Sequence, residues 1–292
     1  MLRGMYTAAA GMIAHQRRHD LITNNIANLN TPGYKAQVGV MRSFPEMLIN
    51  LVNEGADRPS RTIGTLNTGT MVEEVLPIWT QGPLQETANA SDLALISNIR
   101  VFEEVDGVPV EIRFDASGRG VNQAGETVYQ PQAFYTVWNE AGEVRYTRNS
   151  QMVVDAEGLL RTTDGHLVLG QDGQPIALGR SLDSVRVTPA GVLLDEQGEV
   201  LGSLLITRID NPYALIREGA GVYRLEGNEA AAAAADPDDF EIRQGFVERS
   251  NVDPAQSVTD LMVALRAYEA NQRIVQYYDK SLEKAVNEVG RV

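Results

Sequence analysis

The sequence of 292 residues contains no cysteine, which excludes disulfide bonds and cysteine-based zinc sites. Positive charge is scarce as well, because 25 Lys and Arg residues stand against 39 Asp and Glu residues and leave a net charge of −14. A protein that binds a phosphate backbone needs clustered Lys and Arg, so we expect no nucleic-acid partner. The lack of cysteine suits a protein that works outside the cytoplasm, and it is equally consistent with low cysteine usage.

Long hydrophobic runs are also missing. No stretch approaches 18 apolar residues, so we expect no transmembrane helix and no membrane insertion. The polar residues from His15 to Arg18 come too early for the apolar core of a cleavable secretion signal. We therefore expect any route out of the cytoplasm to retain the N-terminus. The length of 292 residues suggests one large domain or two modest ones, and the 43% hydrophobic content is enough to bury a core.

Motifs for catalysis are lacking too. His15 and His19 have the spacing of a metal-binding pair on one helix face, but the sequence offers no intervening Glu and no evident third ligand. The pairs Asp164-Gly165 and Asp172-Gly173 fit hairpin turns better than a calcium loop. A wall-active enzyme would need a carboxylate pair, and no pair of Asp or Glu residues stands out. We expect no enzymatic activity, no cofactor and no metal site.

Helices are predicted at both ends of the chain. The segment from Leu2 to Leu29 has no proline and is rich in Ala, Met, Leu and Ile, although its apolar stripe is imperfect. Pro32 and Gly33 end this helix, because the residue before a proline avoids the α region and glycine permits a positive φ.

The C-terminal helix has the clearer pattern. Asp253 suits the N-cap, Pro254 the first helical position and Gln256 the place of a capping-box partner. Alternating spacings of three and four then predict a heptad seam of Val258, Leu261, Leu265, Tyr268, Gln272, Val275, Asp279, Leu282, Val286 and Val289. A helix from Pro254 to Val289 would be roughly 54 Å long and would need a partner along most of its length.

The middle of the chain is typical of an antiparallel β domain, because short apolar or alternating runs are separated by turn residues. The runs are Leu93–Ile96, Phe134–Trp138, Val144–Thr147, Gln151–Val154, His166–Leu169, Val185–Val187, Val192–Leu194 and Gly202–Thr207. The turns are Asn139–Gly142, Asp155–Gly158, Asp164-Gly165, Asp172-Gly173 and Glu196–Gly198. Six consecutive alanines, Ala230–Ala235, predict a flexible link, with a helical turn as the alternative.

Distinctive motifs lie in or beside both predicted helices, and other motifs lie in the middle of the chain. They are Asn24–Lys35, Gly245–Asp253 and Arg266–Gln272 near the ends, and Tyr146–Asn149, Asp155–Leu160 and Thr163–Gly165 in the β region. Together they resemble the bacterial flagellar rod, hook and hook-basal-body family. Met1–Met12 is most similar to the distal-rod branch, and Arg42–Leu48 resembles one of the paired members of Gram-positive bacteria. In departure from that branch, a segment of about residues 97–132 intervenes before Phe134-Tyr135.

The resemblance implies a structural subunit of the basal-body rod. Such subunits leave the cell uncleaved through the flagellar type III export apparatus. They polymerise with copies of themselves and with other rod and hook subunits into a helical tube, which crosses the cell wall and transmits torque to the hook. The fold class implied is α+β, with the N- and C-terminal helices in a coiled-coil-like layer and a central, mainly antiparallel β domain.

The expected parts of the chain follow from these motifs. They are an N-terminal assembly helix (1–32), an extended connector (33–85), a central β domain (86–228, with the insertion at about 97–132), an Ala-rich linker with the C-terminal signature (229–252) and a C-terminal assembly helix (253–292). The residues expected to serve assembly are Asn24, Asn25, Asn28, Thr31, Pro32, Gly33, Ser250, Asn251, Asp253, Leu261, Leu265, Tyr268, Asn271, Val275 and Leu282.

Several alternatives stay open at this point. The asparagines of the first motif could bond neighbouring subunits, or they could mark only a frayed helix end, because their side chains compete for backbone hydrogen bonds. The C-terminal seam could pair the two termini within one subunit as well as between subunits. The chain could also be a hook-type subunit or a surface-exposed binding module whose middle domain contacts a ligand.

Overall fold

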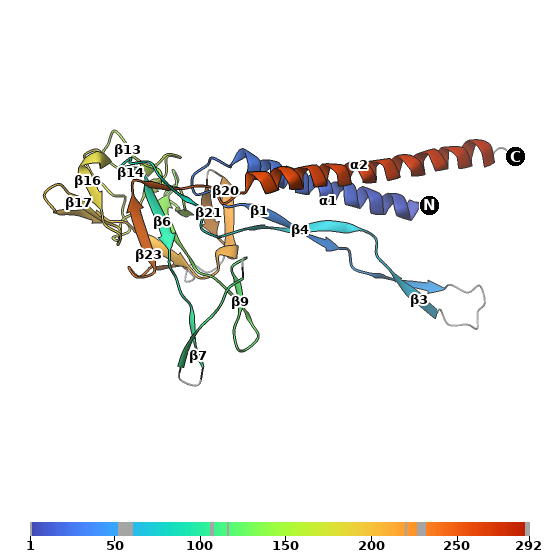
Figure 1. The fold of residues 1–292 in the computed structure, drawn as a ribbon, viewed down its shortest axis with the longest axis horizontal. Coiled ribbons are helices and arrows are strands. Elements are labelled where there is room, and N and C mark those ends of the chain that lie inside the picture. Colours follow the sequence, from blue (N-terminus) through green and yellow to red (C-terminus); the bar gives the residue numbers. More distant parts are fainter. Residues whose placement is uncertain are drawn as a thin grey trace. The chain divides into compact units, whose positions relative to one another are not determined.

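The structure is a computed structural model that describes residues 2–51, 61–105, 108–115, 117–219, 221–226 and 232–289. The chain forms two compact units. The helical unit comprises Met1–Ala27, Gln37–Leu76 and Asp253–Val292, and the β unit comprises Asn28–Ala36 and Pro77–Val252. Figure 1 traces the elements of both units along the chain. The fold class is α+β, as predicted.

The two predicted terminal helices are confirmed in the helical unit. α1 spans Leu2–Ala27, and α2 spans Pro254–Lys284 and continues as a π-helical segment, Ala285–Val289. The side chain of Asp253 caps α2 by accepting hydrogen bonds from the backbone N–H groups of Ala255 and Gln256. The Gln256 amide does not complete a capping box, because it donates instead to Asp260 at 3.2 Å.

Strands occupy much of the segment 33–85, which the sequence predicts to be an extended connector. β1 (Gln37–Ser43) pairs with β4 (Thr70–Pro77), and β2 (Met47–Leu51) forms a hairpin with β3 (Arg61–Leu66). α1 packs on β1 as well as on α2. This approach is close, because a Cβ atom at Gly39 would lie 2.8 Å from Leu21 of α1. Along β1 half-buried and exposed residues alternate over most of the strand, which is the pattern of a strand with one covered face.

The strands of the β unit are short. They are β5 (Leu84–Glu86), β6 (Leu93–Ser97), β7 (Phe102–Val105), β8 (Val108–Glu111), β9 (Arg119–Val121), β10 (Thr127–Tyr129), β11 (Gln132–Trp138), β12 (Val144–Thr147), β13 (Met152–Val154), β14 (Leu160–Thr162), β15 (Leu167–Val168), β16 (Val185–Val187), β17 (Val192–Asp195), β18 (Val200–Ser203), β19 (Ile206–Ile209), β20 (Leu215–Gly219), β21 (Val222–Leu225), β22 (Ala232–Ala234), β23 (Phe240–Gln244) and β24 (Phe246–Glu248). Among the described residues, the 3-10 turns Leu182–Ser184 and Pro212–Ala214 lie between strands.

Antiparallel pairing dominates the β unit, as predicted. Within the described residues, nine strands form one sheet in the order β13-β14-β15-β11-β12-β21-β20, with β19 paired to β11 and to β22. β16, β17 and β18 form a separate sheet, and β6 and β5 pair with β23 and β24. The pairings of β6 with β23 and of β5 with β24 join strands that come before the nine-stranded sheet in the sequence to strands that come after it.

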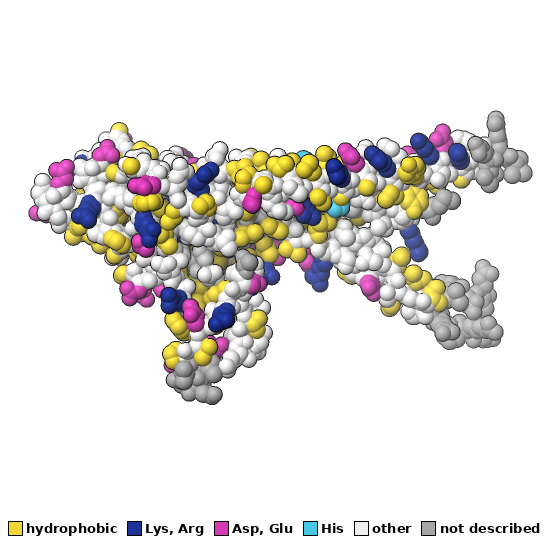
Figure 2. All heavy atoms as spheres, viewed as in Figure 1, with side chains coloured by type: hydrophobic (Ala, Val, Ile, Leu, Met, Phe, Trp, Pro, Cys, Tyr) yellow, Lys and Arg dark blue, Asp and Glu magenta, His cyan; other side chains and the backbone are white. Residues whose placement is uncertain are grey.

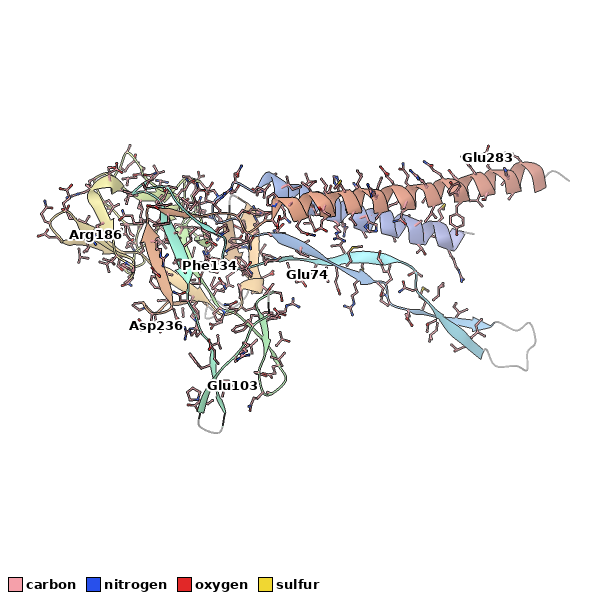
Figure 3. All side chains as sticks on the ribbon, viewed as in Figure 1. Glu74, Glu103, Phe134, Arg186, Asp236 and Glu283 are labelled. Atoms are coloured by element: carbon pink, nitrogen blue, oxygen red, sulfur yellow. The ribbon has the colours of Figure 1, made fainter. Side chains whose placement is uncertain are left out.

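β11 lies at the centre of the β unit and is buried on both faces. Ala133, Tyr135 and Val137 contribute to one hydrophobic cluster, which also holds Leu93 and Leu95 of β6. Phe134, whose side chain lies on the other face of β11, belongs to a second cluster with Trp79, Tyr146 and Tyr223. Phe134 is labelled in Figure 3. A strand that is buried on both faces needs apolar residues at consecutive positions, and such a continuous apolar run predicted β11 from the sequence.

Glycine and Asx residues build the hairpins of the β unit. At the predicted turn Asn139–Gly142, the Asn139 side chain accepts hydrogen bonds from the backbone N–H groups of Ala141 and Glu143. Gly142 has a φ of +76°, which costs glycine little. The other predicted turns are confirmed in the same way, since Gly158, Gly165, Gly173 and Gly198 all have positive φ.

Two segments differ from their predicted form, and the insertion predicted at about residues 97–132 contains strands of its own. The run Gly202–Thr207 is divided between β18 and β19, because the buried Leu204 bridges to Gly170 between two sheets. Within the Ala-rich segment expected to be a link, Ala232–Ala234 form β22 on the edge of β19; Ala230 and Ala231 lie outside the described residues. Pairing with a neighbouring strand overrides the local preference of a polyalanine run. The segment 97–132 forms two hairpins, β7–β8 and β9–β10.

Candidate functional site

α1 and α2 pack side by side through small residues of α1. A Cβ atom added to Gly11 would lie 3.0 Å from the amide nitrogen of Asn271, and one added to Gly4 would lie 2.1 Å from the Tyr278 hydroxyl. Ala8 and Ala14 of α1 are buried as well. The close approach of the two helices at Gly4 and Gly11 therefore depends on positions of α1 that lack a side chain.

The predicted heptad seam of α2 is divided between two surfaces. Leu261, Tyr268, Val275 and Leu282 are half-buried, and Asn271 lies between them against Gly11. The other line of the seam, which includes Val258 and Leu265, is exposed. The face of α2 that packs within the chain has the buried Ala264 at its centre and includes only one line of the predicted seam. A small residue there shifts the packed face by part of a turn and leaves half of the apolar stripe uncovered.

The asparagines of the first motif have different surroundings. Asn25 is buried and holds the end of α1 to β1, since its amide donates to the carbonyl of Gln37 at 2.8 Å and accepts from the N–H of Gln37 at 2.9 Å. Asn28 accepts a hydrogen bond from the Thr31 hydroxyl at 3.2 Å. Asn24 is exposed. Asn25 and Asn28 thus serve the turn within the chain.

The two signature motifs meet inside the β unit. The N–H of Gly33 donates to the carbonyl of Glu248 at 2.9 Å. Asn251 accepts from the N–H of Ala36 at 2.7 Å and donates to the carbonyl of Ile78 at 2.8 Å and to that of Thr80 at 3.1 Å. Residues that are over 200 positions apart in sequence are thereby joined directly.

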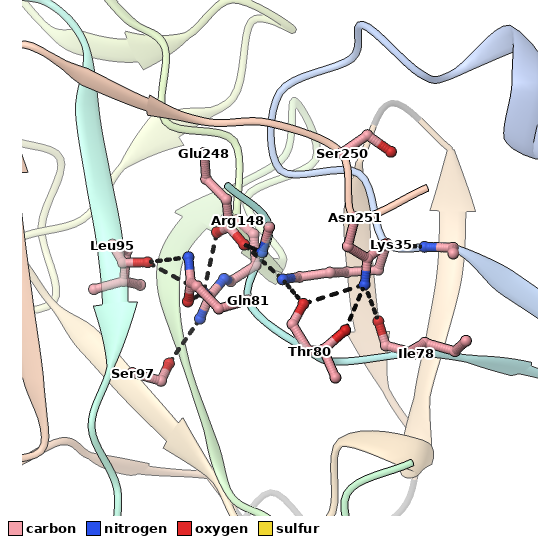
Figure 4. Close-up of polar contacts among 12 residues, drawn as sticks. Lys35, Ile78, Thr80, Gln81, Leu95, Ser97, Arg148, Glu248, Ser250 and Asn251 are labelled. Atoms are coloured by element: carbon pink, nitrogen blue, oxygen red, sulfur yellow. Dashed lines mark hydrogen bonds and ion pairs between the residues drawn. The ribbon is translucent and has the colours of Figure 1, made fainter. Parts of the chain in front are cut away.

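Three buried charges lie at the centre of this junction (Figure 4). The Lys35 ammonium donates to Glu248 Oε1 at 2.6 Å, and the Arg148 guanidinium donates to Glu248 Oε2 at 3.1 Å. The side chains of all three residues are almost completely buried. Arg148 also donates to the carbonyls of Ala133 and Leu95, which ties the two motifs to β11 and β6. We call Lys35, Arg148 and Glu248 the junction triad.

The charge state of the junction triad follows from its burial. Burial lowers the pKa of Lys35 to about 8, although the Glu248 carboxylate opposes this shift. Burial raises the pKa of Glu248, but the positive charges of Arg148 and Lys35 outweigh it and hold that pKa below its usual range. Glu248 is therefore ionised at neutral pH and is the anion that both cations share.

The remaining predicted residues lie around this junction or at the start of α2. Thr31 and Pro32 form the turn before Gly33, in which the N–H of Thr31 donates to the carbonyl of Asn28. Ser250 is buried, and its hydroxyl accepts from the N–H of Val252 at 3.3 Å. Asp253 is the N-cap of α2. Thr31, Ser250 and Asp253 thus make hydrogen bonds within the chain, and their role in assembly stays a prediction.

Within the described ranges, no group of three or more His, Asp or Glu residues is arranged to hold a metal ion. Burial and the nearby Arg18 lower the pKa of His15, which favours the neutral side chain. Among the described helices, none is both long and apolar enough to cross a membrane.

Three family models match the chain at the places where the motifs lie. The model described as "Flagella basal body rod protein" matches residues 5–35, and "Flagellar basal body rod FlgEFG protein C-terminal" matches residues 243–288. Between them, "Flagellar hook protein FlgE/F/G D1 domain" matches residues 128–194. The segment of about residues 97–132 lies almost wholly outside these matches.

Full-length relatives decide the family. The flagellar hook-basal body complex protein FlhO of Bacillus subtilis is 36% identical over 297 residues, which cover 100% of both chains. The chain belongs to the flagellar basal-body rod family. FlhP of the same bacterium is 25% identical over 97% of both chains, and the basal-body rod protein FlgG of Borreliella burgdorferi is 28% identical over 98% of both. This member of the rod family is a structural protein of the flagellar basal body and not an enzyme.

Sequence reasoning missed the junction triad, although each of its members lies in a quoted motif of this rod protein. Lys35 closes the first motif, Glu248 lies in the second and Arg148 lies in the middle one. Lys35 and Arg148 are the only charged residues of their motifs, whereas the second motif also contains Arg249 and Asp253, so the sequence did not single out Glu248. Only the folded chain brings the three charges within hydrogen-bond distance.

Gly33 offers a test of how closely the junction is packed. Its φ is +68°, and a Cβ atom there would lie 2.3 Å from the Arg148 carbonyl oxygen. Gly142 has a similar φ of +76° but has nothing within 4 Å. We expect Gly142→Ala to cost about 1 to 2 kcal/mol from backbone strain alone. Gly33→Ala should cost about 1 to 3 kcal/mol more, because backbone must also move. Urea unfolding measures both, and equal losses would contradict the close packing.

Proposed function

We propose that this chain is built into the flagellar rod through its helical unit, where it contacts copies of itself and adjoining rod and hook subunits in a helical tube. The subunit reaches its place uncleaved through the flagellar type III export apparatus. In the assembled tube, α1 and α2 of successive subunits form a coiled-coil-like layer, and the rod transmits torque to the hook. Membership of the rod family supports this proposal.

The exposed apolar side chains of α2 are the observation that best supports assembly through the helices. α2 exposes several large apolar side chains, while its own partner α1 covers only one of its faces. Burying a Val, Leu or Met side chain completely stabilises a structure by about 1.5 to 3 kcal/mol. A helix with an uncovered apolar surface gains this energy on meeting another helix, which favours assembly over a free monomer. Figure 2 shows hydrophobic side chains along α2 beside the basic ones.

The junction triad suits a part that carries torque. It ties the segment after α1, the segment before α2 and the central strand β11 together within the β unit. A mechanical load enters a subunit wherever neighbouring subunits touch it. Buried ion pairs and hydrogen bonds that join sequence-distant segments resist local unfolding under such a load. The full-length relatives that are named as flagellar basal-body rod proteins favour this function over a ligand-binding module.

Recovery of the chain with basal bodies tests this proposal. Basal bodies isolated after detergent has dissolved the membranes should retain the full-length chain with its N-terminus intact, as read by immunoblot and N-terminal sequencing. The control is the same preparation from cells that lack the chain. A chain found only in the soluble fraction, or one shortened at the N-terminus, would contradict the rod assignment or the uncleaved export respectively.

A further inference from the structure

α2 presents three distinct faces. The face toward α1 contains Ala264, Asn271 and Tyr278, which recur every seven residues. A second row, here called row A, consists of Val258, Met262 and Leu265, which are 49%, 50% and 46% exposed. With 3.6 residues per turn, row A lies about 120° around the helix from the face toward α1.

A third row lies on the other side of the helix. Row B consists of Ala270, Ile274 and Tyr277; Ala270 is exposed, and the other two are 42% and 67% exposed. It too lies about 120° from the face toward α1, in the opposite sense to row A. The exposed Val263 extends this side toward the start of α2. Two separate apolar rows on one helix call for two neighbours.

The two rows have the same internal spacing. Row A steps by four and then three residues, and row B repeats these steps 12 positions later, so Val258 corresponds to Ala270, Met262 to Ile274 and Leu265 to Tyr277. At 1.5 Å per residue, 12 residues correspond to a shift of roughly 18 Å along the helix. Two parallel copies of α2 offset by this shift would place each residue of row A level with one of row B.

The charged residues of α2 are compatible with the same offset of 12 residues. Glu269 lies beside row A, and a shift of 12 residues brings it level with Ser281, within one turn of Lys284 on the side of row B. Between the rows, on the surface farthest from α1, Arg266, Arg273 and Lys280 are exposed. These basic residues would repel one another if that surface met its own copy. A contact between copies is therefore expected through row A and row B, which lie on either side of this basic surface.

We propose that row A of one copy packs on row B of the next copy, with parallel α2 helices offset by 12 residues. The contact is head-to-tail, because it joins two different surfaces, and such contacts continue from copy to copy instead of closing as a dimer. The basic surface of Arg266, Arg273 and Lys280 stays open to solvent. This inference rests on the proposed assembly into a rod and adds which surfaces touch and in what register.

Because this chain contains no cysteine, the introduced thiols are the only ones it can contribute to a disulfide bond. The variant Leu265→Cys/Tyr277→Cys should give a ladder of covalent multimers of this chain when isolated basal bodies are oxidised and separated without reductant. The two thiols of one copy cannot pair, because roughly 18 Å separates them and a disulfide needs Cα atoms within about 7 Å. Met262→Cys/Ile274→Cys and Val258→Cys/Ala270→Cys test the same register independently.

Control variants separate this contact from others. Arg266→Cys/Lys280→Cys should stay monomeric under oxidation and react with a soluble maleimide in intact basal bodies. Monomers from all three register pairs in basal bodies that contain the chain would overturn the inference and leave the rod assignment standing. Dimers from Leu265→Cys alone, or a covalent product with a different subunit only, would also overturn it. A wild-type chain missing from basal bodies would instead contradict the proposed function.

Discussion

Glu248→Gln is expected to lower the free energy of unfolding of the β unit by about 3 to 5 kcal/mol. The substitution keeps the size of the side chain but removes the anion that Lys35 and Arg148 share in the interior. Two buried cations then remain without a counter-charge, and the backbone N–H of Gly82 loses a charged acceptor at 3.0 Å. A loss of this size is a large fraction of the stability of an ordinary domain.

Urea unfolding at neutral pH, followed by the fluorescence of the buried Trp79, measures this loss. Glu241→Gln is the matched control, because it removes the same charge from an exposed pair, in which Arg243 donates to Glu241 at 2.7 Å. Exposed pairs contribute about 0 to 1 kcal/mol, so the control should unfold almost as the wild type does. Similar midpoints for all three proteins would show that the junction triad does not hold the β unit together.

Leu265→Glu is expected to remove the chain from basal bodies and to abolish motility while the subunit stays folded. Leu265 is exposed in the free chain, so a carboxylate there costs the monomer little. In the proposed contact the same position is covered by apolar side chains of the next copy. Burying an unpaired carboxylate in such a contact costs several kcal/mol at every subunit, and the cost recurs along the polymer.

Fractionation of basal bodies and swimming assays measure this effect, with unfolding of the purified subunit as the check on folding. The matched control is Arg273→Glu, which introduces the same residue on the surface of α2 that is proposed to stay open. This control should assemble. Normal incorporation of Leu265→Glu, or equal loss of both variants, would count against packing through row A.

The sequence predicted the elements of this fold well where local chemistry decides them. Asp253 and Pro254 marked the start of α2, and Asn139 with Gly142 marked a hairpin. Cap and turn preferences depend on hydrogen bonds within a few residues, so one stretch of sequence contains the whole signal. The continuous apolar run of β11 was equally clear, because both faces of that strand are buried.

Features that depend on distant partners were harder to predict. The 3-4 pattern of α2 could not show which of its faces is packed, because that depends on α1, where Gly4 lies against Tyr278 and Gly11 against Asn271. The pairing of β22 with β19 likewise overrides the composition of its alanines. Of the candidate residues, Asn25 and Asn251 turned out to bond within the chain, and the charges that hold the junction were passed over. Non-local contacts leave no periodicity in the sequence.

A cryo-electron microscopy map of basal bodies that contain this chain would show the contacts between subunits themselves. We expect α1 and α2 of adjacent copies to form one continuous helical layer, with row A of each copy against row B of the next. The predicted axial offset between these helices is roughly 18 Å. A map in which the α2 helices of adjacent copies do not touch, so that only β units join the subunits, would contradict it.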